Sequence, residues 1–181
     1  MRFKRSVCVG MGAIVAAGAI ASADHIKTFE FPIDVDQTVP MADVTGFSPS
    51  GMGVVTLNTD TNLLEWEITY SGLTGDIVAP GAHFHGPAGV GETGGLQVDI
   101  VGDAAGTGSG MPAPQPSSGV LMGSFTVSDQ QETDILNGLW YVNIHTAANQ
   151  PGEIRGQVTP APASLGLLVA AGLAGGGRRR R

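Results

Sequence analysis

Cysteine and basic residues are nearly missing from this chain. Cys8 is the single cysteine among 181 residues, and it lies in an apolar N-terminal stretch that we expect to be removed. A mature form without cysteine excludes disulfides, thiol catalysis and cysteine-ligated metals. Long helical periodicity is missing too, whereas glycine and proline are abundant and spaced like turn residues.

The scarcity of basic residues makes the body of the chain strongly acidic. Residues 24–160 contain Lys27 and Arg155 against all 16 acidic residues, which gives a formal charge of −14. Such a surface repels nucleic acid and anionic lipid headgroups, so neither is an expected partner. An isolated arginine in so acidic a body predicts a specific carboxylate partner, most simply Glu153.

The N-terminal segment, residues 1–23, has the pattern of a signal peptide. A basic start precedes an apolar run over residues 6–20, and Ala21-Ser22-Ala23 fits a small-residue cleavage site. We therefore expect export to the cell-envelope surface or beyond it.

The C-terminal segment, residues 159–181, combines a proline linker, a short apolar stretch and four terminal arginines. This arrangement resembles the bacterial PEP-CTERM sorting tail, with Pro160-Ala161-Pro162 where that family has Pro-Glu-Pro. The alternative is a weak tail anchor stopped by cytoplasmic arginines. Membrane contact is expected only through the leader or this tail.

Residues 24–158 are long enough for one domain with a single core. Short runs of alternating or β-branched residues, separated by turns, predict an all-β fold: an antiparallel Greek-key-like sandwich or barrel of about eight strands with one short helix. The expected strands cover residues 27–33, 53–57, 64–70, 82–85, 96–101, 120–127, 139–145 and 153–158. Residues 58–62 predict a hairpin turn.

The expected helix starts at a capping box, with Ser128 as N-cap and Gln131 three positions later. Ile135 and Leu136 are predicted to face the core, and Gly138 to end the helix. Residues 102–119 are rich in glycine, alanine, serine and proline and predict an exposed loop.

Three of the four histidines lie in strand-like runs with the opposite parity to the apolar residues. His83 and His85 flank Phe84, and His145 follows Asn143 at the same parity, opposite Val142 and Ile144. Because side chains alternate across a strand, the histidines should point away from the core and form a polar cluster on the outside of a sheet.

This cluster has two interpretations. His83, His85 and His145 could bind zinc or copper, since three histidines with an open position form a known metal site. Alternatively, they hydrogen-bond carboxylates and backbone carbonyls without metal. Glu153 and Arg155 either form a surface salt bridge or support the cluster, with Glu153 fixing a histidine tautomer. Asn143, on the same face as His145, is expected to have a supporting or structural role beside the histidines.

Other candidate sites are weaker, and we assign no catalytic residue. Glu65 and Glu67 share a strand face and are expected to be solvated. Trp66 and Trp140 have the parity of core residues. The chain carries no EF-hand loop, nucleophile elbow, phosphate-binding loop or dinucleotide fingerprint.

The body resembles the CHRD domain, a module first named from chordin. The resemblance rests on residues 82–89, residues 138–146 and the run Pro151 to Gln157, and it spans roughly residues 26–158. It implies an all-β fold and an extracytoplasmic setting, but no reaction. The pair His83-x-His85 is also similar to the His-x-His pair of copper/zinc superoxide dismutases, which are Greek-key sandwiches.

Two functions follow as expectations. The first is an exported, non-enzymatic binding or structural module at the cell surface or in the extracellular matrix, with a protein or extracellular polymer as partner. The second is a zinc- or copper-binding protein that uses the three histidines, with superoxide-dismutase-like activity as one form of this function. No cofactor is certain on the sequence alone.

Overall fold

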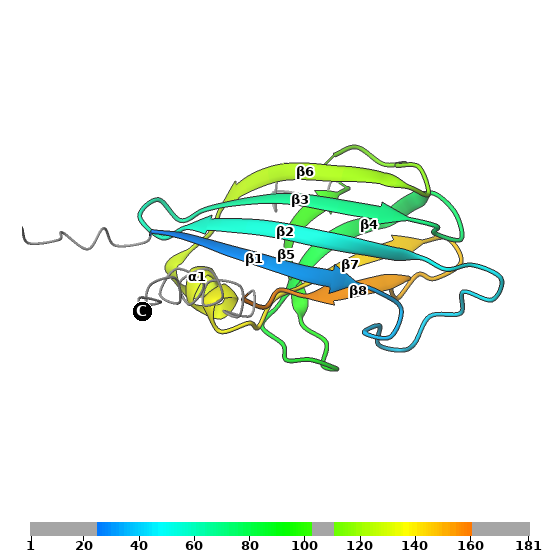
Figure 1. The fold of residues 1–181 in the computed structure, drawn as a ribbon, viewed down its shortest axis with the longest axis horizontal. Helices are drawn as coiled ribbons and strands as arrows, with labels where there is room; N and C mark the ends of the chain where they lie inside the picture. The colour runs from blue at the N-terminus through cyan, green and yellow to red at the C-terminus, as the bar shows by residue number, and fades with distance from the viewer. Residues whose placement is uncertain (1–24, 103–110, 161–181) are drawn as a thin grey trace, which may run out of the picture.

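Two four-stranded antiparallel sheets face each other across one core (Figure 1). The computed structural model describes residues 25–102 and 111–160. The first sheet has the order β1-β2-β3-β6 and the second the order β5-β4-β7-β8. The strands are β1 (Ile26–Ile33), β2 (Ser50–Asn58), β3 (Leu63–Ser71), β4 (Ile77–Gly86), β5 (Gly95–Val101), β6 (Gly119–Thr126), β7 (Tyr141–Thr146) and β8 (Ile154–Gln157). The predicted all-β sandwich is confirmed.

The alternation of apolar and polar residues decides which face of each strand is buried. In β1, Phe29, Phe31 and Ile33 point inward, and in β3 every second residue from Leu64 to Tyr70 does the same. The second sheet contributes Phe84 and Trp140 from the opposite side of the core. Both tryptophans are buried there, as their parity predicts.

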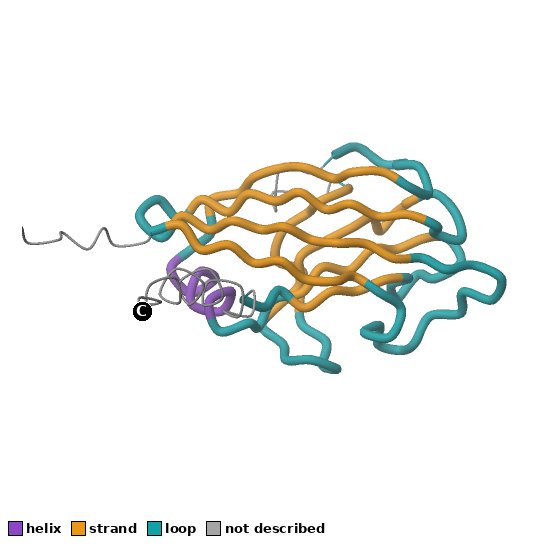
Figure 2. Tube along the Cα trace, in the orientation of Figure 1, coloured by secondary structure: helices purple, strands orange, loops and turns teal. Residues whose placement is uncertain are grey.

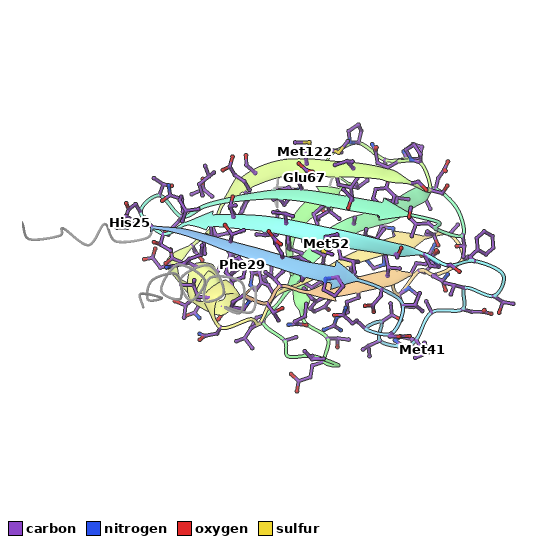
Figure 3. The ribbon with its side chains drawn as sticks, in the orientation of Figure 1. His25, Phe29, Met41, Met52, Glu67 and Met122 are labelled. Atoms are coloured by element: carbon purple, nitrogen blue, oxygen red, sulfur yellow. The ribbon has the colours of Figure 1, made fainter. Side chains whose placement is uncertain are left out.

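The outer face of the first sheet is polar with scattered apolar side chains. Glu65 and Glu67 are exposed, as expected. Figure 3 shows Met52, Glu67 and Met122 on this face, and both methionines are exposed.

The helix α1 (Asp129–Leu136) lies at one end of the sandwich (Figure 2). Ser128 and Gln131 form the predicted capping box, and Gly138 follows the C-cap in a left-handed conformation (φ 71°) that favours glycine. Ile135 packs in the core, but Leu136 is 39% exposed, so its predicted burial is wrong. The helix turns Asp134 and Ile135 toward the sandwich, and Leu136, the next residue round the helix, lies at the border of that buried stripe.

One edge of the sandwich is closed by the first and last strands. Asp34 N donates to Arg155 O at 3.0 Å, and Arg155 N donates to Asp34 O at 2.9 Å. An isolated bridge also joins Phe29 to Pro160. The two sheets are therefore joined by backbone hydrogen bonds along β1 and β8.

Residues 102–119 are only partly the exposed loop that their composition predicts. Residues 103–110 lie outside the described part. Met111 bridges Val101 and packs against the core, and Gln115 bridges Ile77. The expectation of a wholly exposed loop is therefore wrong, because backbone pairing ties this segment to β4 and β5.

None of the helices in the described part is long and apolar enough to cross a membrane.

Candidate metal centre

The structure brings the three predicted histidines together on the outer face of the second sheet. His83 and His85 lie on β4, and His145 lies two residues after Asn143 on the neighbouring strand β7. His83 pairs with Asn143 and His85 with Tyr141 in the register of these strands. One potential ligand atom from each histidine lies within 4.8 Å of the other two.

Each histidine has one ring nitrogen that faces an oxygen acceptor. His85 Nδ1 lies 3.2 Å from Gly94 O, and His145 Nδ1 lies 2.8 Å from Gln150 O. His83 Nε2 lies 3.2 Å from Asp99 Oδ1. Asp99 pairs with His83 in the register of β4 and β5. For His85 and His145, these contacts fix the ring orientation and leave the lone pair on the other nitrogen.

The opposite nitrogens have no such contact. His83 Nδ1, His85 Nε2 and His145 Nε2 are buried atoms without a hydrogen-bond partner in the described part of the chain. Buried polar atoms are nearly always hydrogen-bonded, so three unpartnered nitrogens in one cluster require an explanation.

The histidines occupy the predicted face, but their predicted position at the surface is wrong. His83 and His145 are 3% and 5% exposed, and His85 is half-buried. Two connections lie over this face: residues 87–94 between β4 and β5, and residues 147–153 between β7 and β8. Strand parity distinguishes the two faces of a sheet but contains no information on loops that cover the outer face.

Burial keeps the three rings neutral. Burial is the largest cause that lowers the pKa of His145 to about 4, and the neighbouring His83 and His85 contribute to this value. Burial also lowers the pKa of His83, against the opposing effect of the Asp99 carboxylate, and that of His85. Neutral imidazole is the form that binds metal, so the cluster is ready for an ion at pH 7.

The predicted surface salt bridge between Glu153 and Arg155 is wrong. Both residues are buried, because the covering connections bury this part of the sheet. Glu153 accepts hydrogen bonds from Thr74 N at 2.6 Å, from Thr146 Oγ1 at 2.5 Å and from Asn149 Nδ2 at 3.1 Å. These donors include none of the histidines, so the carboxylate holds the covering turn and not a tautomer.

Arg155 holds the other connection. Its guanidinium donates to Glu92 O at 2.7 Å and to Gly89 O at 3.3 Å, both in residues 87–94. The guanidinium carbon lies 3.6 Å from the centre of the Tyr141 ring, a cation–π contact. The predicted carboxylate partner of Arg155 is thus replaced by backbone carbonyls and an aromatic face.

A model of the CHRD domain matches residues 29–158. This chain belongs to the CHRD family. The match contains the three histidines and both connections that cover them. CHRD domains are, at the level of the family, binding or structural modules typical of secreted or extracellular proteins. Comparison with curated proteins gives no match, and comparison with solved structures gives none.

Two residues beside the histidines of this CHRD site, Tyr141 and Asp99, were not among the predicted site residues. Tyr141 stacks on His85 with ring centroids 5.2 Å apart, and its hydroxyl accepts a hydrogen bond from Gly94 N. Asp99 faces His83 through the register of β4 and β5. The alternation within β5 places Asp99 on the same parity as Gln97, opposite Val98 and Ile100, and that signal could have identified it.

A cavity of about 580 Å³ reaches His83 from the edge of the CHRD module. Its walls are mostly apolar and include Pro80, Leu96 and Pro112. His83 is the member of the histidine cluster that lines this cavity.

Proposed function

We propose that this protein is an exported, non-enzymatic CHRD module that binds one divalent transition-metal ion, zinc or copper, through His83, His85 and His145. Two observations carry the proposal. Each of the three histidines has a buried ring nitrogen without a hydrogen-bond partner in the described residues. One potential ligand atom from each ring lies within 4.8 Å of the other two.

The energetics favour an ion over an unoccupied cluster. A buried polar atom without a partner costs about 1–3 kcal/mol, and three such atoms lie in this cluster. Nitrogen–metal bonds of about 2 Å would satisfy all three at once. Imidazole nitrogen suits zinc and copper, whereas magnesium and calcium prefer oxygen ligands.

Metal analysis of the untagged full chain tests the proposal. We expect about one zinc or copper ion per chain after incubation with the metal and dialysis, and no bound ion in a His83→Gln/His85→Gln/His145→Gln variant. His25→Gln is the matched control, because His25 is exposed and contacts Asp60 away from the cluster. Wild-type protein that takes up neither zinc nor copper would refute the proposal.

Export is the second part of the proposal. It is supported by the family's extracellular setting and by the leader-like residues 1–23. A protein or extracellular polymer remains the proposed partner at the cell surface. Cell fractionation should find the protein outside the cytoplasm. Deletion of residues 2–20 should keep it in the cytoplasm, and an unchanged distribution after this deletion would contradict export.

A further inference from the structure

We propose that Asn143 Oδ1 provides the fourth contact to the metal ion, so that the site is a closed set of three nitrogens and one oxygen. This inference rests on the proposed function and specifies the ligands of the same site. The sequence predicted three histidine ligands and an open position. In our proposal, Asn143 fills that position and makes the site four-coordinate.

The position of Asn143 follows from strand register. Asn143 pairs directly with His83 across β4 and β7, and it precedes His145 by two residues on the same face. Directly paired residues have Cβ atoms about 4.5–5.5 Å apart, and residues two apart on one strand are neighbours on that face. Asn143 therefore lies between two of the three histidines.

The Asn143 side chain resembles the His85 and His145 rings in its hydrogen bonding: one of its polar atoms has a partner and the other has none in the described residues. Its Nδ2 donates to Pro151 O at 2.9 Å, which fixes which end of the amide is oxygen. Its Oδ1 is buried without a hydrogen-bond partner in the described residues, and the side chain is 8% exposed. Four side chains at neighbouring positions on the outer face thus each have one buried N or O atom without a hydrogen-bond partner in the described residues.

The turn after β7 is shaped to hold this amide. Gly152 has a φ of +133°, and a Cβ added there would lie 2.1 Å from Asn143 Oδ1. Only glycine lets the backbone approach the amide this closely. The Pro151 carbonyl and the Gly152 backbone together fix the side chain beside the histidines.

Other polar side chains next to the cluster are already engaged. The Tyr141 hydroxyl accepts from Gly94 N, and Arg155 donates to Glu92 O and Gly89 O. An amide oxygen can act as an uncharged metal ligand. Three imidazole nitrogens with one oxygen form a four-coordinate set that suits zinc.

Cobalt(II) absorption of the full-length chain, read with and without azide, tests the closed site. Azide adds to a metal ion that has an open position and changes its visible spectrum. His83 lines a cavity large enough for so small an anion. We expect azide to leave the wild-type spectrum unchanged and to alter that of Asn143→Leu, in which the fourth contact is removed.

Affinity measurements separate a ligand from a merely structural amide. Asn143→Leu should weaken zinc binding at least about tenfold. Asn143→Asp should bind zinc more tightly through its charged oxygen, although its metal-free form should be less stable because Pro151 O loses its donor. Gln157→Leu is the matched control, since Gln157 is another buried amide that donates to Ala88 O and Gly138 O; its zinc affinity should match the wild type.

The outcomes are distinguishable. Wild-type protein that binds neither zinc nor cobalt refutes the proposed function, and this inference with it. Metal uptake together with a wild-type spectrum that responds to azide, or with zinc affinities unchanged in the Asn143 variants, refutes the role of Asn143 alone. If Asn143→Leu fails to fold, zinc binding by Asn143→Asp that is no tighter than wild type refutes that role.

Discussion

Glu153 is a fully buried carboxylate that forms no ion pair with a basic side chain in the described residues. Its charge is stabilised by hydrogen bonds alone. The donors are Thr74, on the connection between β3 and β4, and Thr146 and Asn149, at the start of the covering turn after β7. Glu153 therefore joins the connection between β3 and β4 to the covering turn after β7, and we call this set of hydrogen bonds the Glu153 clamp.

Replacing Glu153 should destabilise the fold. Glu153→Leu leaves several buried donors without an acceptor, and we expect the free energy of unfolding to fall by about 3 kcal/mol. Glu153→Gln should cost less, because it keeps one acceptor oxygen. Urea unfolding of the metal-free protein measures both. Exposed Glu67→Gln is the control and should change stability by no more than about 0.5 kcal/mol; equal effects at the two sites would contradict the clamp.

The depressed pKa of His145 predicts a pH dependence of stability in the metal-free protein. The folded pKa is about 4, against an ordinary value of 6.5, so the unfolded chain binds the proton more readily between these values. The stabilising contribution is complete above pH 6.5 and is lost as the pH falls toward 4, at about 1.4 kcal/mol per unit of pKa difference. The unfolding free energies of wild type and His145→Gln, compared at pH 7 and pH 4.5, isolate this contribution. Their difference should change with pH, and a constant difference would be evidence against it.

At the scale of elements, α1 offers a matched pair of apolar neighbours. Ile135 is 1% exposed and Leu136 is 39% exposed on the same helix. Ile135→Ala should lower the free energy of unfolding by about 2–5 kcal/mol through the lost burial and the cavity, whereas Leu136→Ala should cost under about 1 kcal/mol. Thermal or urea unfolding distinguishes them, and similar losses would mean that both side chains contact the core in solution.

The connection of residues 87–94 depends on Arg155. Arg155→Met keeps much of the apolar bulk but removes the bonds to Glu92 O and Gly89 O. We expect faster amide hydrogen exchange in residues 87–94, including Gly94, with unchanged exchange in β2 and β3. Lys27→Met is the control, since it removes the other cation of the acidic body. Unchanged protection of the connection would show that Tyr141 and Gln157 hold it without Arg155.

The sequence predicted strands and their faces well because alternation reports them directly. It placed Phe84, Trp140 and the three histidines on their correct sides of the second sheet. It could not predict that the histidines are buried, since the covering connections, residues 87–94 and 147–153, have no periodic pattern. Glu153 and Arg155 were paired by proximity in sequence, but Glu153 accepts from Thr74 and Arg155 donates to Glu92, both far along the chain.

At the scale of the whole molecule, the formal charge of −14 on residues 24–160 should oppose folding through self-repulsion. The Debye length falls from about 30 Å at 0.01 M salt to about 8 Å at 0.15 M. The melting temperature should therefore rise between these sodium chloride concentrations. Glu65→Gln/Glu67→Gln removes two exposed charges and should show a smaller rise; a melting temperature independent of salt would contradict the argument.

The backbone hydrogen bonds that join the end of β1 to β8 have a consequence for the order in which the chain folds. The hydrogen-bonded residues, Asp34 and Arg155, lie near opposite ends of the domain, so their reciprocal hydrogen bonds close a loop that contains most of the sandwich. Contacts so distant in sequence form slowly, because loop-closure entropy is lost before they are made. A chain emerging from N- to C-terminus, from a ribosome or through a membrane pore, has to hold β1 on β2 without this edge until β8 appears. Folding of the nascent domain should thus be completed only when its last strand has emerged.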